Sequence, residues 1–243
     1  MRSPEKTIVH EAGVAKREMV KTLKRSVVFQ DLAPSELAEF ASRIDPRFYP
    51  KGSFIFREGD PADSIHIVHD GLVRVLRHSR SGKKLIFAIL AQGEIIATPG
   101  PSEKRLRVSS EAVTDIVLFR VPKEEFLEYV AGRPKAAIGM FALLAKRFNR
   151  ECDRSVDTLS EEVEIRLAHC LHILGSKFGT RLSLTRRELA AYAGTTTETT
   201  IRMLGKLKEK GLILHSPNPG EIVIADLAVL RRYAKAPVLR KDR

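Results

Sequence analysis

The sequence predicts an α+β protein: an N-terminal antiparallel β-roll, jelly-roll-like, then a long helix and a C-terminal winged helix-turn-helix. Three observations lead to this fold class. Residues 48–121 are short apolar runs separated by glycine or proline, residues 134–159 carry a narrow apolar stripe, and residues 184–224 read as two short helices followed by two short strands. With 243 residues and 43% hydrophobic composition, the chain can form two modest domains, each with its own core.

The β-roll is predicted within residues 27–132. Residues 1–26 mix lysine and arginine with a weak helical pattern but without a clear apolar face, so we expect a partly ordered, basic N-terminal extension. A short helix follows near residues 34–44, with Leu37, Phe40 and Ile44 on one face. The apolar runs of residues 48–121 are broken by turn signals every 8 to 15 residues, which is typical of antiparallel strands that close into a roll.

A long helix is predicted over residues 133–157. Pro134 suits a helix start, and apolar residues recur at spacings of three or four over roughly six turns: Ile138, Phe141, Ala145, Phe148, Cys152, Val156 and Leu159. Such a helix can lie on the roll or pair with its copy in a second chain, and the narrow stripe favours the pair. Thr158 and Glu161 form a capping-box pattern for a further helix that ends near Gly175, so residues 158–160 are the expected hinge.

Composition limits the class of protein. Two cysteines, Cys152 and Cys170, cannot supply a four-thiolate iron–sulfur or zinc site, and we expect both to be structural. The chain has no apolar run of roughly 20 residues and no signal-peptide centre, so the expected location is the cytoplasm, without a membrane partner. The net charge is +12, and residues 161–243 carry 15 basic against 9 acidic side chains. This excess favours a polyanionic partner for the C-terminal part.

Residues 161–236 contain the predicted winged helix-turn-helix. Thr185 and Glu188 form a capping box before the first helix, and Gly194 supplies the turn. Apolar residues at Leu189, Ala193, Ile201, Leu204 and Leu207 would lock the two helices together at a steep angle. Two short apolar strands around the Pro-Asn-Pro-Gly turn form the wing, and residues 237–243 are a basic tail.

The second helix of this motif begins with small hydroxyl residues, so its N-terminal end can enter a major groove. The residues expected to read bases are Thr197, Glu198, Ile201 and Arg202. An arginine can donate two hydrogen bonds to guanine and a glutamate can accept one from cytosine, although Glu198 could instead cap its helix with Thr195, and Arg202 could contact a phosphate. The candidates for contacts to the DNA backbone are Thr185, Thr195, Thr196, Thr199 and Lys206.

The order of these parts resembles the CRP/FNR family of bacterial transcription regulators over residues 27–234. The resemblance rests on Gly59 and Asp60 after a strand, Gly71 at a later turn, and the pair Glu198 and Arg202 on the second helix. It implies a homodimer formed through the long helix, a two-fold symmetric DNA site with TGA-type half-sites, RNA polymerase as a partner, and an effector that acts at the roll. Ile201 departs from the serine that FNR-type members often have at this position.

The sensor region departs most from the family. Its candidate effector-pocket residues are Ile96, Ala97, Thr98, Arg105 and Arg107. Ala97 and Thr98 replace the Gly-Glu pair that binds ribose in cyclic-nucleotide members, and neither arginine is followed by Ser or Thr, so cyclic AMP is not the expected effector. The cysteine cluster of FNR-type sensors is absent, and Ala97 and Pro99 replace the haem ligands of carbon-monoxide sensors.

Other inputs remain open from the sequence alone. His66 and His69 point to opposite faces of one strand, so at most one faces inward, and His69 is the candidate haem ligand. Two alternatives to haem are an anionic metabolite, bound by Lys104, Arg105 and Arg107, and the absence of any effector. A cupin-like metalloenzyme is disfavoured because both histidines cannot ligate one metal from one straight strand, and residues 184–224 disfavour a cyclic-nucleotide-type binding protein without DNA function. We therefore expect a regulator and not an enzyme.

Overall fold

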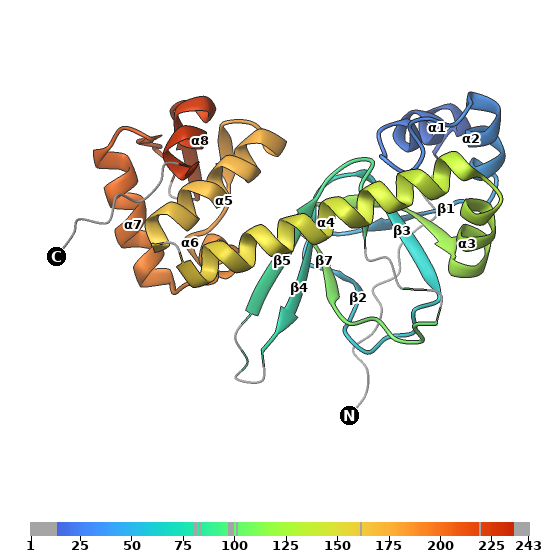
Figure 1. Cartoon of the computed structure of the whole chain (residues 1–243), viewed down its shortest axis with the longest axis horizontal. Helices are drawn as coiled ribbons and strands as arrows, with labels where there is room; N and C mark the ends of the chain where they lie inside the picture. Colours follow the sequence, from blue (N-terminus) through green and yellow to red (C-terminus); the bar gives the residue numbers. More distant parts are fainter. Residues whose placement is uncertain are drawn as a thin grey trace. The chain divides into compact units, whose positions relative to one another are not determined.

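The computed structural model describes residues 14–79, 82, 84–96, 100, 102–160, 162–218 and 220–235. The chain divides into two compact units between Asn149 and Arg150, and each unit is considered by itself (Figure 1). Neither unit contains, in the part described, a helix long and apolar enough to cross a membrane.

The N-terminal unit contains an antiparallel β-roll, as predicted. Its two four-stranded sheets have the orders β1-β8-β3-β6 and β2-β7-β4-β5. The strands are β1 (Asp45–Tyr49), β2 (Phe54–Phe56), β3 (Ser64–Asp70), β4 (Val73–His78), β5 (Lys84–Leu90), β6 (Ile95–Ile96), β7 (Ser109–Ala112) and β8 (Ile116–Pro122). The predicted apolar runs supply β2 to β8.

Strand alternation gives this unit two apolar cores. On β3, Ile65 and Ile67 pack among the helices of the unit, whereas Val68 belongs to a second cluster with Phe56, Val73 and Leu118. Because successive side chains of a strand point to opposite faces, the second cluster marks the interior between the two sheets. We refer to this region as the roll interior.

Three short helices cover the other face of β3: α1 (Lys16–Lys24), α2 (Pro34–Ala41) and α3 (Lys123–Ala131). The short helix predicted near residues 34–44 is confirmed as α2, with Leu37 and Phe40 fully buried. The expectation of an extension over residues 1–26 is wrong for residues 16–24. They form α1 because Met19 and Leu23 insert into the helical core, a long-range contact that the local charge pattern hides.

The long helix α4 (Pro134–Ser160) starts at Pro134 as predicted but continues through the expected hinge. The next helix, α5 (Val163–Phe178), starts after Glu162 without a side-chain cap, so the capping box predicted for Thr158 and Glu161 does not begin it. The helix ends at Phe178, three residues beyond Gly175, which packs so closely that an added Cβ would be 2.5 Å from the Ile224 side chain.

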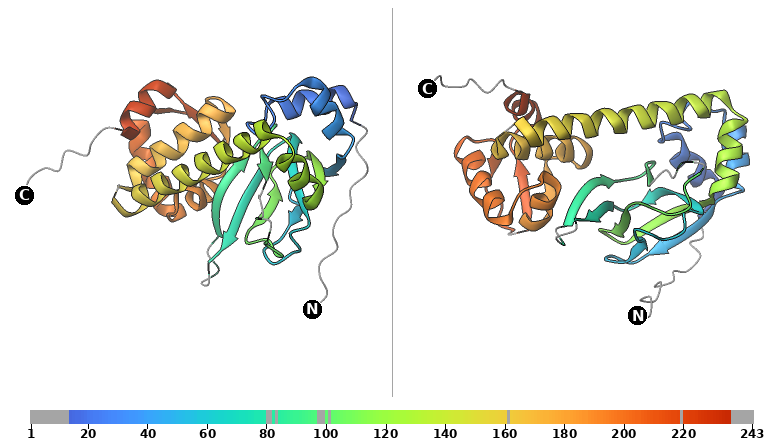
Figure 2. Two further views of the ribbon diagram at one scale, coloured as in Figure 1. Left: turned by 45° about the vertical axis from the view of Figure 1, so that its right-hand side comes forward. Right: turned by 60° about the horizontal axis from the view of Figure 1, so that its bottom comes forward.

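The C-terminal unit is built from α5, α6 (Arg186–Ala193), α7 (Thr197–Glu209) and α8 (Leu227–Lys235), with a small sheet of order β10-β11-β9 (Figure 2). The strands are β9 (Arg181–Ser183), β10 (Ile213–Leu214) and β11 (Glu221–Ile224). β10 and β11 form the predicted wing, with Ile213 opposite Ile224. β9 adds a third strand that the sequence pattern did not reveal.

Gly139 sets how closely α4 approaches the loop after α1. A Cβ at this position would lie 2.6 Å from the Val27 carbonyl oxygen and 2.8 Å from the Val28 Cα, both backbone atoms. We therefore predict that Gly139→Ala destabilises the protein by about 1–3 kcal/mol through overpacking. Gly205→Ala is the matched control, because α7 leaves open space there, and it should stabilise by roughly 0.5–1 kcal/mol. Calorimetric unfolding of both variants measures this difference, and equal effects would contradict it.

Candidate nucleic-acid interface and sensor site

The α6–α7 pair is fixed at both helix starts and at the turn between them. Thr185 caps α6: its hydroxyl accepts from the Glu188 N–H at 3.1 Å, and the Glu188 carboxylate accepts from the Thr185 N–H at 2.9 Å. Gly194 ends α6 in the left-handed region, at φ 67°. These features confirm the predicted capping box and the predicted glycine turn.

Thr196, and not Thr195, caps the second helix. The Thr196 hydroxyl accepts from the Thr199 N–H at 3.2 Å and lies 3.0 Å from the Thr199 hydroxyl. The alternative in which Glu198 caps the helix with Thr195 is therefore not what the structure shows. Three of the residues predicted to contact the DNA backbone also make the helix-cap hydrogen bonds: Thr185, Thr196 and Thr199. Thr195 precedes the cap, and its N–H donates to the Ala190 carbonyl.

Packing between the two helices uses Leu189, Ala193, Leu204 and Leu207, as predicted, with Met203 in addition. Ile201 was expected in this contact as well as on the outer face, and the first expectation is wrong. Its side chain is 56% exposed. Thr200 is the buried residue instead, with its hydroxyl donating to the Thr196 carbonyl at 2.9 Å.

The predicted base-reading residues form one open surface on the first turns of α7. Glu198, Ile201 and Arg202 are exposed, and Thr197 is half-buried. Among the residues that the structure describes, no hydrogen bond or ion pair engages Glu198 or Arg202. A carboxylate, an apolar side chain and a guanidinium thus face solvent side by side, with their hydrogen-bonding groups unused. This arrangement can read base edges directly.

The other end of α7 is held by a buried carboxylate. Glu164, in the first turn of α5, accepts from the Lys210 ammonium and from the Tyr233 hydroxyl of α8, both at 2.5 Å. Burial raises the pKa of Glu164, but the hydrogen bonds from Lys210 and Tyr233 outweigh burial and lower it on balance. Lys206, predicted to contact the DNA backbone, lies 3.9 Å from the same carboxylate. We call Glu164, Lys210 and Tyr233 the anchor of α7; sequence reasoning missed it because its members are up to 69 residues apart.

In the roll, the predicted pocket residues do not converge. Ile96 is buried in the roll interior opposite His66. Ala97 and Thr98 lie outside the described residues. Arg105 is exposed and donates to the Gly59 carbonyl at 2.8 Å, and exposed Arg107 pairs with Glu103 at 3.0 Å. Both arginines are on the surface because Leu106 between them points inward. The described part of the predicted pocket therefore lacks an inward-facing arginine clamp.

His66 and His69 face opposite sides of β3, as expected, but the inward one is His66. Its ring lies 5.6 Å from Phe56 in the roll interior. His69 faces the helices, where its Nδ1 atom is 2.8 Å from the Thr22 hydroxyl and its ring stacks on Phe119. The assignment of His69 as a haem-ligand candidate in the roll is therefore wrong: strand parity separates the two histidines, but only the tertiary packing shows which face is inside.

Sequence reasoning also missed a polar group beside His66. Ser110, on β7, is fully buried opposite Phe56 and Val75, two residues of the roll interior. Its hydroxyl has no hydrogen-bond partner among the described residues. His66 and Ser110 are thus neighbours of Phe56 from the two facing sheets. Strand alternation in "VSSEA" places Ser110 and Ala112 on the same face of the strand. It does not show which face points into the roll interior.

Comparison with known proteins identifies both units. Residues 46–133 match the model of the cyclic nucleotide-binding domain, and residues 165–233 match that of the Crp-like helix-turn-helix domain. The cyclic AMP receptor protein of Thermus thermophilus is 34% identical over 87% of this chain and 98% of its own length. The chain belongs to the CRP/FNR family of transcription regulators.

Solved CRP/FNR structures share the fold. FixK2 from Bradyrhizobium japonicum has a TM-score of 0.70 at 22% identity, covering 78% of this chain and 96% of that one. The c-di-GMP responsive global regulator CLP from Xanthomonas campestris also has a TM-score of 0.70 at 22% identity, covering 80% of this chain and all of the other. The Crp-like helix-turn-helix match and the Thermus thermophilus relative make the chain a DNA-binding transcription regulator with a cyclic nucleotide-binding-type roll.

In this CRP/FNR chain, α4 carries an apolar stripe that the chain itself leaves open. Ile138, Phe141 and Phe148 are each about 70% exposed, at 68%, 74% and 69%. Ala145, in the same stripe, is half-buried. Cys152 is exposed and Cys170 is half-buried, so the expectation that both cysteines are buried and structural does not hold within one chain. Val156 and Leu159 lie on the helix, but their side chains are outside the described part. Among the described residues, no group of three or more metal-ligating side chains converges.

His66 gives a pH-dependent test of the roll interior. Burial, with the positive charge of Arg120, lowers the pKa of His66 to about 4, while Asp63 acts in the opposite sense. Below pH 6.5 His66 is protonated in the unfolded chain but stays neutral in the folded chain. The free energy of unfolding therefore falls as pH drops from about 6.5 to 4, by up to about 3 kcal/mol.

We predict that this loss is reduced in His66→Phe, which has no titrating ring. Denaturant unfolding at pH 7 and pH 4.5 measures it in both proteins. A proton NMR titration that places the His66 pKa near 6.5 would contradict the buried, neutral imidazole.

Proposed function

We propose that the chain acts as a homodimer that binds a two-fold symmetric duplex DNA site with TGA-type half-sites and that a small molecule in the roll controls this binding. The observation that carries the proposal is the unengaged reading surface of Glu198, Ile201 and Arg202 on α7. Arg202 donates to guanine, Glu198 accepts from cytosine, and Ile201 packs on a thymine methyl group. We also propose RNA polymerase as a partner of the chain. Because DNA and RNA polymerase are in the bacterial cytoplasm, we assign the chain to the cytoplasm.

The apolar stripe of α4 supports the homodimer. Side chains at spacings of three and four on one helix face are covered best by the same face of a second copy, in a coiled-coil pair. Two-fold symmetry then places two reading helices about one DNA turn apart, roughly 34 Å. Leu144, which is 46% exposed, flanks the stripe and widens the apolar face.

Two arginines on α4 offer a path from the roll to the reading helices. The Arg147 guanidinium donates to the Ile95 carbonyl of β6, the strand that also places Ile96 in the roll interior. Seven residues on, the Arg154 guanidinium donates to the Tyr192 carbonyl of α6 at 2.9 Å and lies over the Tyr192 ring. A ligand that displaces β6 would act on α4, and α4 would carry the change to α6. Such control is a shift between two populations of the dimer, without chemistry.

For the effector we propose a neutral molecule with an apolar body, and not cyclic AMP. The Thermus thermophilus relative is named for cyclic AMP, but here Ala97 and Thr98 provide no carboxylate for a ribose, and Arg105 and Arg107 are used at the surface. Among the described residues, two neutral polar groups face the roll interior, the His66 imidazole and the Ser110 hydroxyl. Arg120, on the same face of β8 as Leu118, is paired with Asp63 at 3.5 Å.

Equilibrium dialysis tests the effector class. We expect cyclic AMP at millimolar concentration to remain unbound and to leave DNA affinity unchanged. Native mass spectrometry of the purified protein measures the mass of any small molecule that stays bound through purification. Micromolar binding of cyclic AMP that strengthens DNA binding would contradict this part of the proposal. Binding of DNA with no ligand dependence would contradict effector control but leave the reading surface intact.

Base reading is tested by Arg202→Ala. On a site selected from random duplex DNA, we expect the substitution to cost about 1–3 kcal/mol of binding free energy and to relax the preference at one base pair. Lys208→Ala is the control: Lys208 lies on the exposed side of the same helix and contacts His215 at 3.2 Å. Fluorescence anisotropy at fixed salt measures both on matched and scrambled sites. An equal loss on the two sites would make Arg202 a phosphate contact.

A further inference from the structure

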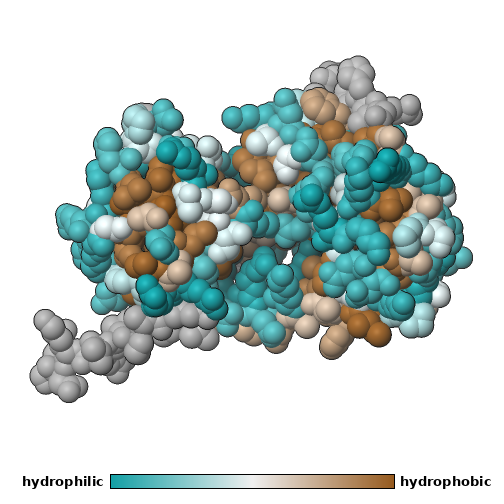
Figure 3. Space-filling model, turned by 90° about the horizontal axis from the view of Figure 1, so that it is seen from above, coloured by the Kyte–Doolittle hydropathy of each residue, from teal (hydrophilic) through white to brown (hydrophobic). Residues whose placement is uncertain are grey.

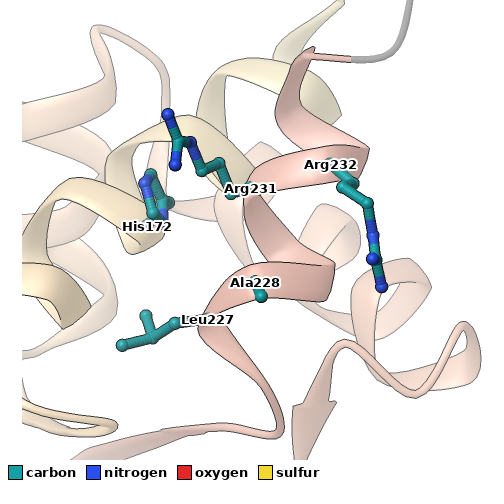
Figure 4. Close-up of a pocket in the computed structure, with 5 residues that line it drawn as sticks. All are labelled: His172, Leu227, Ala228, Arg231 and Arg232. Atoms are coloured by element: carbon teal, nitrogen blue, oxygen red, sulfur yellow. The ribbon is translucent and has the colours of Figure 1, made fainter.

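A hollow in the C-terminal unit lies between α5 and α8. Its volume is about 560 Å³, and small-molecule sites range from roughly 300 to 1,000 Å³. It is lined by His172, Leu227, Ala228, Arg231 and Arg232. Figure 4 shows Arg231 extending toward His172 of α5, with Leu227 on the same side of α8, while Arg232 extends from the other side. The hollow therefore joins an apolar floor to cationic side chains.

The apolar floor is held in place from behind. Leu230, on the same helix, is fully buried, and a Cβ added at Gly175 of α5 would lie 2.6 Å from the Leu227 Cδ2 atom. The Tyr233 hydroxyl ties the C-terminal end of α8 to Glu164 in the anchor. Figure 3 looks onto the α8 side of this unit and shows apolar residues surrounded by hydrophilic ones. A ligand would thus meet a preformed apolar surface, as in most small-molecule sites.

The positive charge of the hollow is not neutralised within the described part of the chain. The segment Leu227–Lys235 contains no acidic residue, and no hydrogen bond or salt bridge engages Arg231 or Arg232 among the described residues. The adjacent acid, Asp226, caps α8 by accepting from two backbone N–H groups at 2.6 and 3.0 Å. Those hydrogen bonds and, to a smaller extent, Arg232 lower the pKa of Asp226. Two guanidinium groups are thus available to an external anion.

The chemistry of these groups selects an organic carboxylate. A guanidinium presents parallel N–H donors that match the two oxygens of a carboxylate. The floor beside Arg231 favours a carboxylate that carries an aromatic ring or a short aliphatic chain, because Leu227 and Ala228 would remove this body from water. An inorganic anion would leave most of the hollow unfilled and would gain nothing from the apolar floor.

Two other sources of negative charge fit the described residues less well. The residues that follow α8 have the wrong sign, because residues 236–243 carry three basic side chains and one acidic. The DNA that α7 reads lies at the other end of that helix: the anchor ties α8 to Lys210 at the C-terminal end of α7, and residues 198–202 are about 12–18 Å away along the helix axis. This separation favours a small ligand over the DNA backbone.

We propose that the α5–α8 hollow is a binding site for a small organic carboxylate with an apolar body. The carboxylate accepts two hydrogen bonds from the Arg231 guanidinium, the body lies on Leu227 and Ala228, and Arg232 adds positive charge from the other side of α8. The site is separate from the effector site proposed for the roll. Because Ala228, Arg231 and Arg232 are exposed, the hollow encloses its ligand only in part, and we expect a millimolar dissociation constant.

The test uses the full-length protein and para-fluorobenzoate, whose carboxylate and ring match the two parts of the hollow. Fluorine NMR measures the binding of this probe and of para-fluorobenzamide, which has a similar shape without the charge. The variant is Arg231→Gln, and the matched control is Arg187→Gln, an exposed arginine in the first turn of α6 in the same unit. Light-activated para-azidobenzoate marks the binding position, and mass spectrometry identifies the labelled peptide.

We expect saturable binding of para-fluorobenzoate and none of para-fluorobenzamide, with inorganic phosphate unable to displace the probe at equal concentration. Arg231→Gln should weaken binding roughly tenfold, equivalent to about 1.4 kcal/mol, whereas Arg187→Gln should bind as the wild type does. The photolabel should fall within residues 227–232. Equal affinity of the three proteins, equal binding of the amide, displacement by phosphate or a label elsewhere would overturn the inference.

Three further outcomes would assign the hollow to another occupant and overturn the inference. Displacement of the probe by a poly-glutamate peptide at a far lower concentration would indicate an acidic protein segment. A tenfold loss of DNA affinity in Arg231→Gln would make the hollow a DNA contact, and a changed sedimentation mass of this variant would indicate a contact between copies. Carboxylate binding is measured without DNA, so failure of the proposed function would leave this inference intact.

Discussion

The apolar stripe on α4 is the constraint from which the other features follow. Ile138, Phe141 and Phe148 are each about 70% exposed on a helix of 27 residues. Exposing several large apolar side chains on one face costs free energy that a partner surface recovers. The same helix cannot turn this face inward, because its other side is committed: Gly139 lies against the Val27 and Val28 backbone, and Met140 and Leu143 pack on the helical core. A second copy is the partner that this geometry favours.

In the proposed mechanism, two arginines of α4 relay a change in the roll to the reading helix. Arg147 joins the helix to β6 at the edge of the roll interior, and Arg154 joins it to α6 beside the reading helix. Within the C-terminal unit, Glu164 holds the far end of α7 through Lys210. Among the described residues, Glu198 and Arg202, the proposed base-reading side chains, take part in none of these hydrogen bonds. In this they differ from Lys206, which lies 3.9 Å from the Glu164 carboxylate.

The sequence was informative wherever a signal is local. The capping box of Thr185 and Glu188, the turn at Gly194, the start of α4 at Pro134 and the alternation of the strands are set by neighbouring residues, and the structure confirms each. It failed where the outcome depends on distant contacts. Thr158 and Glu161 resemble a helix start, yet no glycine or proline lies between Gly139 and Ser160, and the helix continues to Ser160. Parity separated His66 from His69 but could not show which face the helices α1 and α2 cover.

The dimer formed through α4 is the central claim, and sedimentation equilibrium tests it most directly. The wild-type chain should sediment at twice its 27.2 kDa mass, and Phe148→Glu, which places a charge in the stripe, should shift the protein to the mass of one chain. Lys146→Glu changes an exposed residue on another face of the same helix and should remain at the dimer mass. A wild-type protein at the monomer mass, or a Phe148→Glu variant that stays dimeric at the lowest concentrations measured, would contradict the account.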